Sequence, residues 1–279
     1  MPRWTQDDIP WEAFDPDRLS QDLLALAKAA ALTEYNAAQY TLTLRKIFSD
    51  DDAFSRLVGD WQVEEEQHGA VLGRYGAMAD PSFDFERSFR LFRDGYVLPG
   101  GGDRSVRGSR AGELLARCVV ETGTSSFYTA MGEATGEPVL KAICHRIAGD
   151  EYRHYRMFLE ALRRYQSGEG LSLPARIRVV VGRIRETDDD ELAFAYHCAN
   201  EPDRPYDRDH CNRLYSVSAY GLYRYHHARK VVGMTFKAAG LDPQSRLSEW
   251  TSRWAWRKMG RRASAPVPTR ARDEGRPGP

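Results

Sequence analysis

Two short segments decide the fold of this 279-residue chain: WQVEEEQHG at residues 61–69 and GDEYRH at residues 149–154. Each contains a glutamate followed three positions later by a histidine, in one case Glu65 and His68 and in the other Glu151 and His154. On an α-helix these positions lie on one face about one turn apart, so each pair can offer a carboxylate and an imidazole to the same metal ion. One such pair arises readily by chance, and two pairs alone are only suggestive.

A further glutamate lies one predicted helix upstream of each pair. Glu34 precedes Glu65 by 31 residues, and Glu121 precedes Glu151 by 30 residues, so the chain contains two helical hairpins with nearly the same placement of acids. If the hairpins pack as a four-helix bundle, four carboxylates and two imidazoles meet at mid-height, which is the ligand set of dinuclear carboxylate bundles. The sequence therefore predicts a site for two metal ions.

The neighbours of these glutamates on their helix faces are apolar, whereas a solvent-facing glutamate is expected to have polar neighbours. Cys118 shares a face with Glu121, for example, and Ile147 shares one with Glu151. A solvated acidic face would explain the run at residues 64–66 but not the inward glutamates, because a buried carboxylate without a partner is costly. Such an oxygen-rich set suits iron or manganese better than zinc, so we expect two iron ions, with manganese an alternative in one site.

Long segments with helical periodicity and sparse proline and glycine predict an all-α fold. We expect a four-helix bundle with additional C-terminal helices packed outside it, as one domain over residues 1–260. A tail at residues 261–279, poor in apolar side chains and rich in proline, is expected to be disordered. Helices are expected at residues 20–48, 83–96, 109–131, 139–165, 174–185, 188–199 and 207–240. Another helix is expected from the acidic turn at 50–52 to residue 78, and a last one is expected to end near residue 259. A glycine-rich loop is expected at 98–102 and a glycine-containing turn at 132–138.

The composition disfavours several classes of protein. Forty basic and forty acidic residues give a formal net charge of zero, which argues against a general nucleic-acid binder. No apolar run approaches the roughly 18 residues of a membrane span, and we expect no export signal from the composition of the first residues. The four cysteines form no C-x-x-C pair, so we expect reduced thiols in a cytoplasmic protein.

With these motifs in view, the sequence resembles the soluble acyl-carrier-protein desaturases, a family of the ferritin-like di-iron superfamily. The family phrase W-x-x-E-E-x-x-H-G is met by residues 61–69, and the phrase D-E-x-R-H is met by residues 150–154. The preceding segment LKAICHRIAG, residues 140–149, is also similar to the family, and the resemblance extends over roughly residues 20–165. It implies a ferritin-like bundle that contains two iron ions.

The resemblance also implies roles for individual residues. Glu65 and Glu151 would bridge the two irons. Glu34 and Glu121 would bind one iron each, and His68 and His154 would complete the set. Thr124 matches a threonine beside the oxygen site that is associated with proton delivery. Trp61 and Asp150 match positions that orient ligands or pass electrons.

The activity implied is the removal of two hydrogens from neighbouring methylenes of an acyl chain on an acyl carrier protein, a step of fatty acid metabolism. Dioxygen would be the co-substrate, a ferredoxin-type protein the electron donor, and a homodimer the assembly. Candidates for lining the acyl channel are the aromatic residues Tyr35, Phe127, Tyr128, Tyr152 and Tyr155. The same ligands also fit a hydroxylase, an N-oxygenase, an aldehyde-cleaving enzyme or a metal-binding or ferroxidase protein.

A segment near the C-terminus, WTSRWAWRK at residues 250–258, interleaves tryptophans with cations. This pattern can suit an acidic carrier protein, a membrane surface or RNA. Packing of the tryptophans onto the bundle is the interpretation that the sequence favours.

Overall fold

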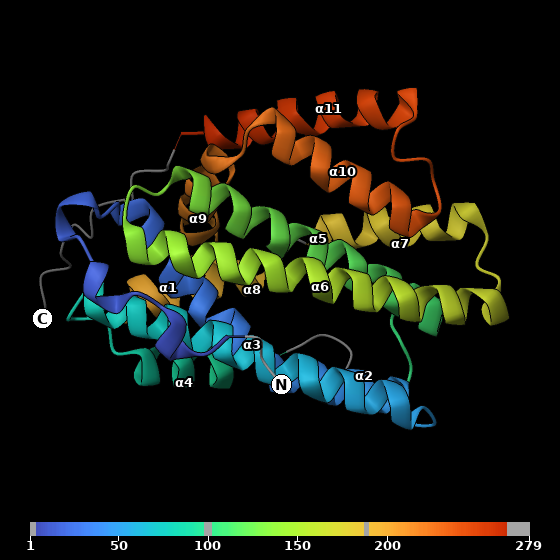
Figure 1. Ribbon diagram of the computed structural model, residues 1–279, viewed down its shortest axis with the longest axis horizontal. Helices are drawn as coiled ribbons and strands as arrows, with labels where there is room; N and C mark the ends of the chain where they lie inside the picture. Colours follow the sequence, from blue (N-terminus) through green and yellow to red (C-terminus); the bar gives the residue numbers. More distant parts are fainter. Residues whose placement is uncertain (1–3, 98–101, 187–189, 267–279) are drawn as a thin grey trace, which may run out of the picture.

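Two long helical hairpins form the centre of the molecule in the computed structural model, which describes residues 4–97, 102–186 and 190–266 (Figure 1). Within these ranges the chain forms eleven α-helices, three short 3-10 helices and no β-strand. The prediction of an all-α, ferritin-like bundle is confirmed. The short helices precede the bundle at Gln6–Asp8, Trp11–Ala13 and Pro16–Arg18.

The first hairpin consists of α1 (Gln21–Tyr35) and α3 (Asp52–Ala79), joined by the shorter α2 (Ala37–Ile47). Each long helix begins at a side-chain cap, which satisfies an amide that has no partner within the helix. The Ser20 hydroxyl accepts a hydrogen bond from the third residue of α1, and the Asp51 carboxylate accepts one from the third residue of α3. Both starts agree with the sequence-based boundaries.

The prediction of a single helix over residues 20–48 is wrong, because the chain leaves the helical conformation at Asn36. This residue has φ −82° and ψ 10°, in the bridge region that is sparsely populated and frequent near functional sites. The break follows Tyr35, whose backbone packs tightly against α3. A Cβ atom on Gly69 would lie 2.5 Å from the Tyr35 nitrogen, so only glycine permits this approach.

The second hairpin consists of α5 (Arg110–Ala134) and α6 (Pro138–Glu169), which pack along most of their length. Gly132, which we expected in the turn, belongs to the last part of α5. A Cβ atom there would lie 3.1 Å from Cβ of Cys144, so the glycine helps the two helices to approach closely. Gly170 ends α6 in the left-handed conformation with φ 62°, as is common after a helix.

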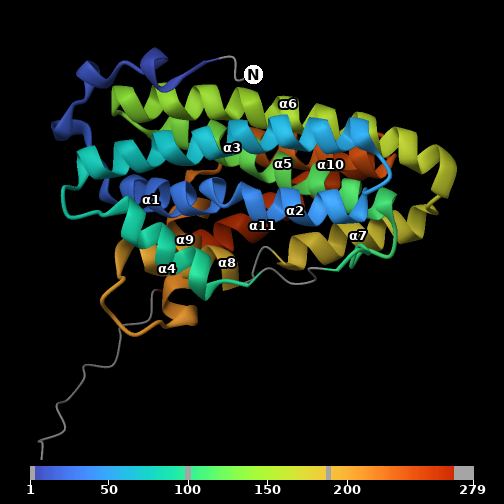
Figure 2. The ribbon, with the colours of Figure 1, turned by 90° about the horizontal axis from the view of Figure 1, so that it is seen from below.

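The remaining helices pack outside the two hairpins, as expected from the sequence, and most of them lie on the side formed by α1 and α5 (Figure 2). Helix α8 packs on α1, helices α7 and α10 pack on α5, and α11 packs on α9 and α10. Their bounds are α4 (Phe85–Gly95), α7 (Leu173–Glu186), α8 (Asp190–Asn200), α9 (Arg208–Leu222), α10 (Tyr225–Ala239) and α11 (Arg246–Ala263).

Two C-terminal boundaries differ from the expectation. The helix expected over 207–240 is interrupted at Tyr223 and Arg224, which are extended. The Arg224 amide donates to Nδ1 of His227 at 2.9 Å, which starts α10 as a separate helix. Helix α11 continues to Ala263, beyond the expected end near 259 and into the expected tail. The rest of the expected tail from 267, residues 98–101 of the glycine-rich loop expected at 98–102, and residues 187–189 lie outside the described residues.

Two apolar clusters fill the bundle on either side of its middle. One includes Leu72 and Ile147, and the other includes Val58, Leu114 and Phe158. All four cysteines are buried, and none forms a disulfide within the described residues. Among the helices of the described residues, none combines the length and the apolar character that crossing a membrane requires.

Candidate metal centre

A cluster of four carboxylates and two imidazoles lies between the two apolar clusters. It unites the six residues that the sequence singled out, from α1, α3, α5 and α6. Their side-chain atoms form two overlapping groups, and within each group the candidate ligand atoms all lie within 4.8 Å of one another: Glu34, Glu65, His68 and Glu151 in one, and Glu65, Glu121, Glu151 and His154 in the other. Because Glu65 and Glu151 belong to both groups, the geometry suits two neighbouring ions that share two carboxylates.

Five buried atoms that face the centre of the cluster make no hydrogen bond within the described residues: Oε1 of Glu65, Nδ1 of His68, Oε2 of Glu121, Oε1 of Glu151 and Nδ1 of His154. They face one another instead, with Nδ1 of His154 2.9 Å from Oε1 of Glu65 and Nδ1 of His68 3.2 Å from Oε1 of Glu151. A buried polar atom without a partner carries a desolvation cost, and such an atom in a native fold calls for a missing partner. A donor set of carboxylate oxygens and imidazole nitrogens fits iron or manganese. The cluster could therefore hold metal ions.

Each histidine is oriented by a carboxylate on its far side. Asp150 Oδ2 lies 3.1 Å from Nε2 of His68, and Glu64 Oε2 lies 2.8 Å from Nε2 of His154. A proton on Nε2 that is donated to a carboxylate leaves the Nδ1 lone pair free, and here Nδ1 is the atom that faces the cluster. The sequence had indicated Asp150 but not Glu64, which lies in an acidic run typical of a solvated face.

Two further residues that were not among the predicted site residues support these carboxylates. Arg153 donates to Glu64 at 3.2 Å and also to Asp150, so one guanidinium connects the two orienting carboxylates. The indole of Trp4 donates to Asp150 Oδ2 at 2.7 Å and stacks parallel to the ring of His68. The motif at residues 150–154 places Arg153 near the site. No local sequence signal indicates Trp4, because it is 146 positions away from Asp150 in the sequence.

Trp61, which the family resemblance placed beside the ligands, lies on the other side of the cluster. Its ring meets the ring of His154 edge to face, with 6.5 Å between centroids. Its indole nitrogen is buried and makes no hydrogen bond within the described part of the chain. Trp61 therefore shields His154, and Trp4 is the tryptophan that bonds Asp150.

Two hydroxyl groups contact the carboxylates of the cluster. Thr124 Oγ1 lies 2.5 Å from Glu151 Oε2, and the Tyr128 hydroxyl donates to Glu34 Oε1 at 2.6 Å. Tyr128 is thus an internal hydrogen-bond donor to the cluster. Tyr152, another residue expected to line a channel, is instead 43% exposed on the outside of α6.

The crowding of acids also changes their protonation. Burial, together with the charges of neighbouring glutamates, raises the pKa of Glu34 and of Glu121 well above the ordinary range. Burial opposes the protonation of His154, but the surrounding carboxylates outweigh it and raise the pKa to about 9. The cluster therefore needs positive charge, from protons or from metal ions.

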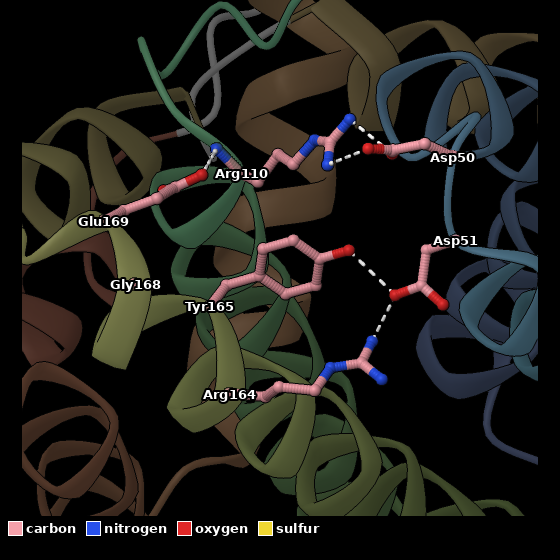
Figure 3. Close-up of a pocket in the computed structure, with 7 residues that line it drawn as sticks. All are labelled: Asp50, Asp51, Arg110, Arg164, Tyr165, Gly168 and Glu169. Carbon is pink, nitrogen blue, oxygen red and sulfur yellow. Dashed lines mark hydrogen bonds and ion pairs between the residues drawn. The ribbon is translucent and has the colours of Figure 1, made fainter.

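The pocket in Figure 3 is separate from this cluster and lies where the ends of α2 and α6 meet the starts of α3 and α5. Its volume is about 520 Å³, and its charged groups are largely paired with one another. Asp51 accepts from the Tyr165 hydroxyl at 2.8 Å and from Arg164, while Asp50 pairs with Arg110 at 2.6 Å. These contacts connect the two hairpins at the end of the bundle.

The fold and the buried cluster define a helical bundle protein with a carboxylate–histidine site, and comparison with known proteins adds the family. A family model described as fatty acid desaturase matches residues 15–167, more than half of the chain and all six residues of the cluster. The chain belongs to this fatty acid desaturase family.

Curated relatives agree with this assignment. The chain is 27% identical over 175 residues to acyl-(acyl-carrier-protein) desaturase 6, chloroplastic, of Oryza sativa subsp. japonica. The protein of the same name from Oryza sativa subsp. indica shows the same identity over the same length. Each alignment covers 58% of this chain and 40% of the relative, so the chain spans less than half the length of these relatives.

Proposed function

We propose that this protein is a di-iron oxidoreductase that uses dioxygen to introduce a double bond into an acyl chain carried by an acyl carrier protein. The observation that carries the proposal is the pair of overlapping ligand groups that share Glu65 and Glu151. Membership of the fatty acid desaturase family and the names of the rice relatives support the reaction and the substrate class.

In this proposal each residue of the cluster has a defined task. Glu65 and Glu151 would be shared by the two ions, whereas each of the remaining four residues would hold one ion: Glu34 and His68 on one side, and Glu121 and His154 on the other. When bound, the iron ions would supply the oxygen chemistry that removes two hydrogens from neighbouring methylenes.

The surrounding residues prepare the site for that chemistry. Asp150 and Glu64 fix the two imidazoles, because each accepts a hydrogen bond at Nε2. Thr124 holds a proton next to Glu151 Oε2 and is the residue to which we assign proton delivery. Electrons from a ferredoxin-type donor would have a route through the hydrogen-bonded series of Trp4, Asp150 and His68.

The direct test is turnover by the iron-loaded protein. Acyl carrier proteins charged with saturated chains of several lengths would be incubated with the protein, a ferredoxin, its reductase, NADPH and dioxygen, and the released fatty acids identified by mass spectrometry. We expect a product lighter by two hydrogens for at least one chain length. A Glu65→Gln variant should lose the reaction, whereas Glu66→Gln, which changes the next residue outside the cluster, should keep it.

The other outcomes distinguish the alternative functions. A hydroxylated, N-oxygenated or shortened product would identify a different di-iron oxygenase. Repeated oxidation of ferrous iron with every organic substrate unchanged would identify a ferroxidase. Either result would refute the proposed desaturation. Size-exclusion chromatography with light scattering would separately test the homodimer that the family resemblance implies.

A further inference from the structure

The outward face of α11 carries aromatic side chains in contact with solvent. Trp250 is 64% exposed, Trp254 is 53% exposed and Leu247 is 56% exposed, whereas the buried residues of this helix are Ser248 and Ser252. A surface helix normally places its apolar face inward and its polar face outward. Helix α11 does the reverse at these positions, so the expectation that its tryptophans all pack onto the bundle is wrong for Trp250 and Trp254.

Cations surround these apolar side chains along the helix. Four exposed arginines of α11 recur at spacings of seven, four and four, which keeps them near one face, and Lys258 lies next to them; the arginines are Arg246, Arg253, Arg257 and Arg261. The sole acidic residue of the helix is Glu249, which pairs with Arg253 at 3.0 Å. Lys258 lies over the ring of Trp254. Within the described ranges, Arg246, Arg257 and Arg261 have no recorded ion pair.

A shallow pocket of about 510 Å³ lies at the start of this helix. Three guanidinium groups and an exposed indole contribute to its wall. The complete lining is Arg229, Gln244, Ser245, Arg246, Glu249, Trp250 and Arg253. Although Glu249 offsets part of the positive charge, the excess of guanidinium groups suits the phosphate of a lipid headgroup.

We propose that the outward face of α11 docks this protein on a bilayer surface that contains anionic phospholipids. Tryptophan and leucine on such a face enter the headgroup region, while long basic side chains reach the phosphates, so one helix can lie in the plane of the interface. In Figure 1, α11 lies along one edge of the molecule, outside α9 and α10, where a flat surface can reach it.

Two features favour a bilayer over an acidic protein as the occupant. Cations alone would suffice to attract an acidic protein, but the exposed Trp250 and Trp254 need an environment that removes their rings from water. A bilayer interface provides this environment along the whole helix without any shaped groove. The net charge of zero for the chain does not oppose docking, because screening over about 8–10 Å makes the local charge of α11 decisive.

Co-sedimentation with vesicles tests the proposal on the full chain. Vesicles of equal parts phosphatidylcholine and phosphatidylglycerol should sediment with the protein and shift its tryptophan emission to the blue, whereas phosphatidylcholine alone should do neither. Trp250→Ser combined with Trp254→Ser should lower the partition coefficient at least about tenfold. Arg246→Gln, Arg257→Gln and Arg261→Gln together should lower it by about fivefold for each charge removed.

Matched controls separate this face from general effects of charge and apolar area. The triple control removes three exposed arginines elsewhere, by Arg56→Gln, Arg90→Gln and Arg93→Gln, and the apolar control combines Leu42→Ser with Leu91→Ser. Both should bind vesicles as the unchanged protein does, and circular dichroism should show the same helix content throughout.

The proposal is overturned if anionic vesicles do not bind, or if controls and α11 variants weaken binding equally. Capture by an acyl carrier protein without any vesicle binding, or oligomers that depend on Trp250 and Trp254, would also overturn it.

Discussion

Asp150 Oδ2 lies 3.1 Å from Nε2 of His68, on the side of the imidazole that faces away from the clustered glutamates. Burial alone would raise the pKa of Asp150, but hydrogen bonds from His68 and Arg153 outweigh it and lower the pKa, so this carboxyl stays ionised. An ionised acceptor at Nε2 increases the basicity of the imidazole at Nδ1. The strength of the proposed metal site therefore depends on a residue that does not bind the metal.

We first predict that Asp150→Asn weakens metal binding by about 10–100-fold without changing the fold. Asparagine occupies the same volume but brings no charge to His68. Anaerobic titration with Fe²⁺, or with Mn²⁺ in air, followed by calorimetry would measure the loss. Asp60→Asn removes an exposed carboxylate from the same bundle and should leave the affinity unchanged; equal effects of the two substitutions would contradict the prediction.

A second prediction concerns the run of three glutamates on α3. Glu64 is bonded to His154, Glu65 lies in the cluster, and Glu66 accepts a hydrogen bond from the neighbouring Gln62. Glu64→Gln should weaken binding of one ion more than the other, because, of the two imidazoles, only that of His154 loses its charged acceptor. Metal analysis at limiting concentrations should then give fewer than two ions per chain, while Glu66→Gln retains the full number. An unchanged stoichiometry in both variants would show that the orientation of His154 is not limiting.

The fold was predictable from the sequence where helical periodicity and a capping residue both marked the start of a helix. Repeated helical periodicity and the caps at Ser20 and Asp51 placed the starts of α1 and α3 correctly. The break at Asn36 was not predictable, because it depends on the close approach of Tyr35 and Gly69 from another helix. Local propensity carries no information about that contact.

The candidate site was predictable to the extent that its residues form local motifs. The two Glu-x-x-His pairs and their upstream glutamates are visible in the sequence, and the structure brings all six side chains together. Trp4 was missed because it bonds Asp150 across 146 positions of sequence. Glu64 was missed because one acid in an acidic run does not differ in sequence from its neighbours.

A third prediction is that divalent metal stabilises the folded chain. Ions that bind the native cluster and not the unfolded chain add about 2.7 kcal/mol at a free concentration of 100 times the dissociation constant. Differential scanning fluorimetry of the chelated protein should therefore show a higher midpoint after addition of Fe²⁺ without oxygen or of Mn²⁺. His154→Ala should reduce this rise, whereas His145→Ala, on the exposed side of α6, should preserve it. A rise of the same size in His154→Ala would place the stabilising ion elsewhere.

A fourth prediction separates proton delivery from metal binding at Thr124. Its hydroxyl is bonded to Glu151 Oε2 at 2.5 Å, and valine has a similar shape without the hydroxyl. Thr124→Val should bind metal normally but slow product formation by about 10²–10⁴-fold, the usual contribution of a positioned acid or base. Thr124→Ser keeps the hydroxyl and should recover most of the rate. Loss of metal from Thr124→Val would instead assign the residue to support of Glu151.

The last prediction concerns the end of the bundle, where Asp51 joins the two hairpins. Its carboxylate caps α3 and also accepts from Tyr165, and its side chain is only 16% exposed, against 68% for that of Asp50. Asp51→Ala should lower the free energy of unfolding by about 1–2 kcal/mol, measured in urea, and Asp50→Ala should lower it less.

Burial would raise the pKa of Asp51, but the amide of Phe54, Tyr165 and Arg164 lower it below 3.8. A group with a lowered folded pKa stabilises the protein above its ordinary pKa and loses that effect as pH falls through the folded value. The difference between Asp51→Ala and the unchanged protein should therefore be constant near neutral pH and shrink only below about pH 4. A difference that grew in acid would contradict this assignment.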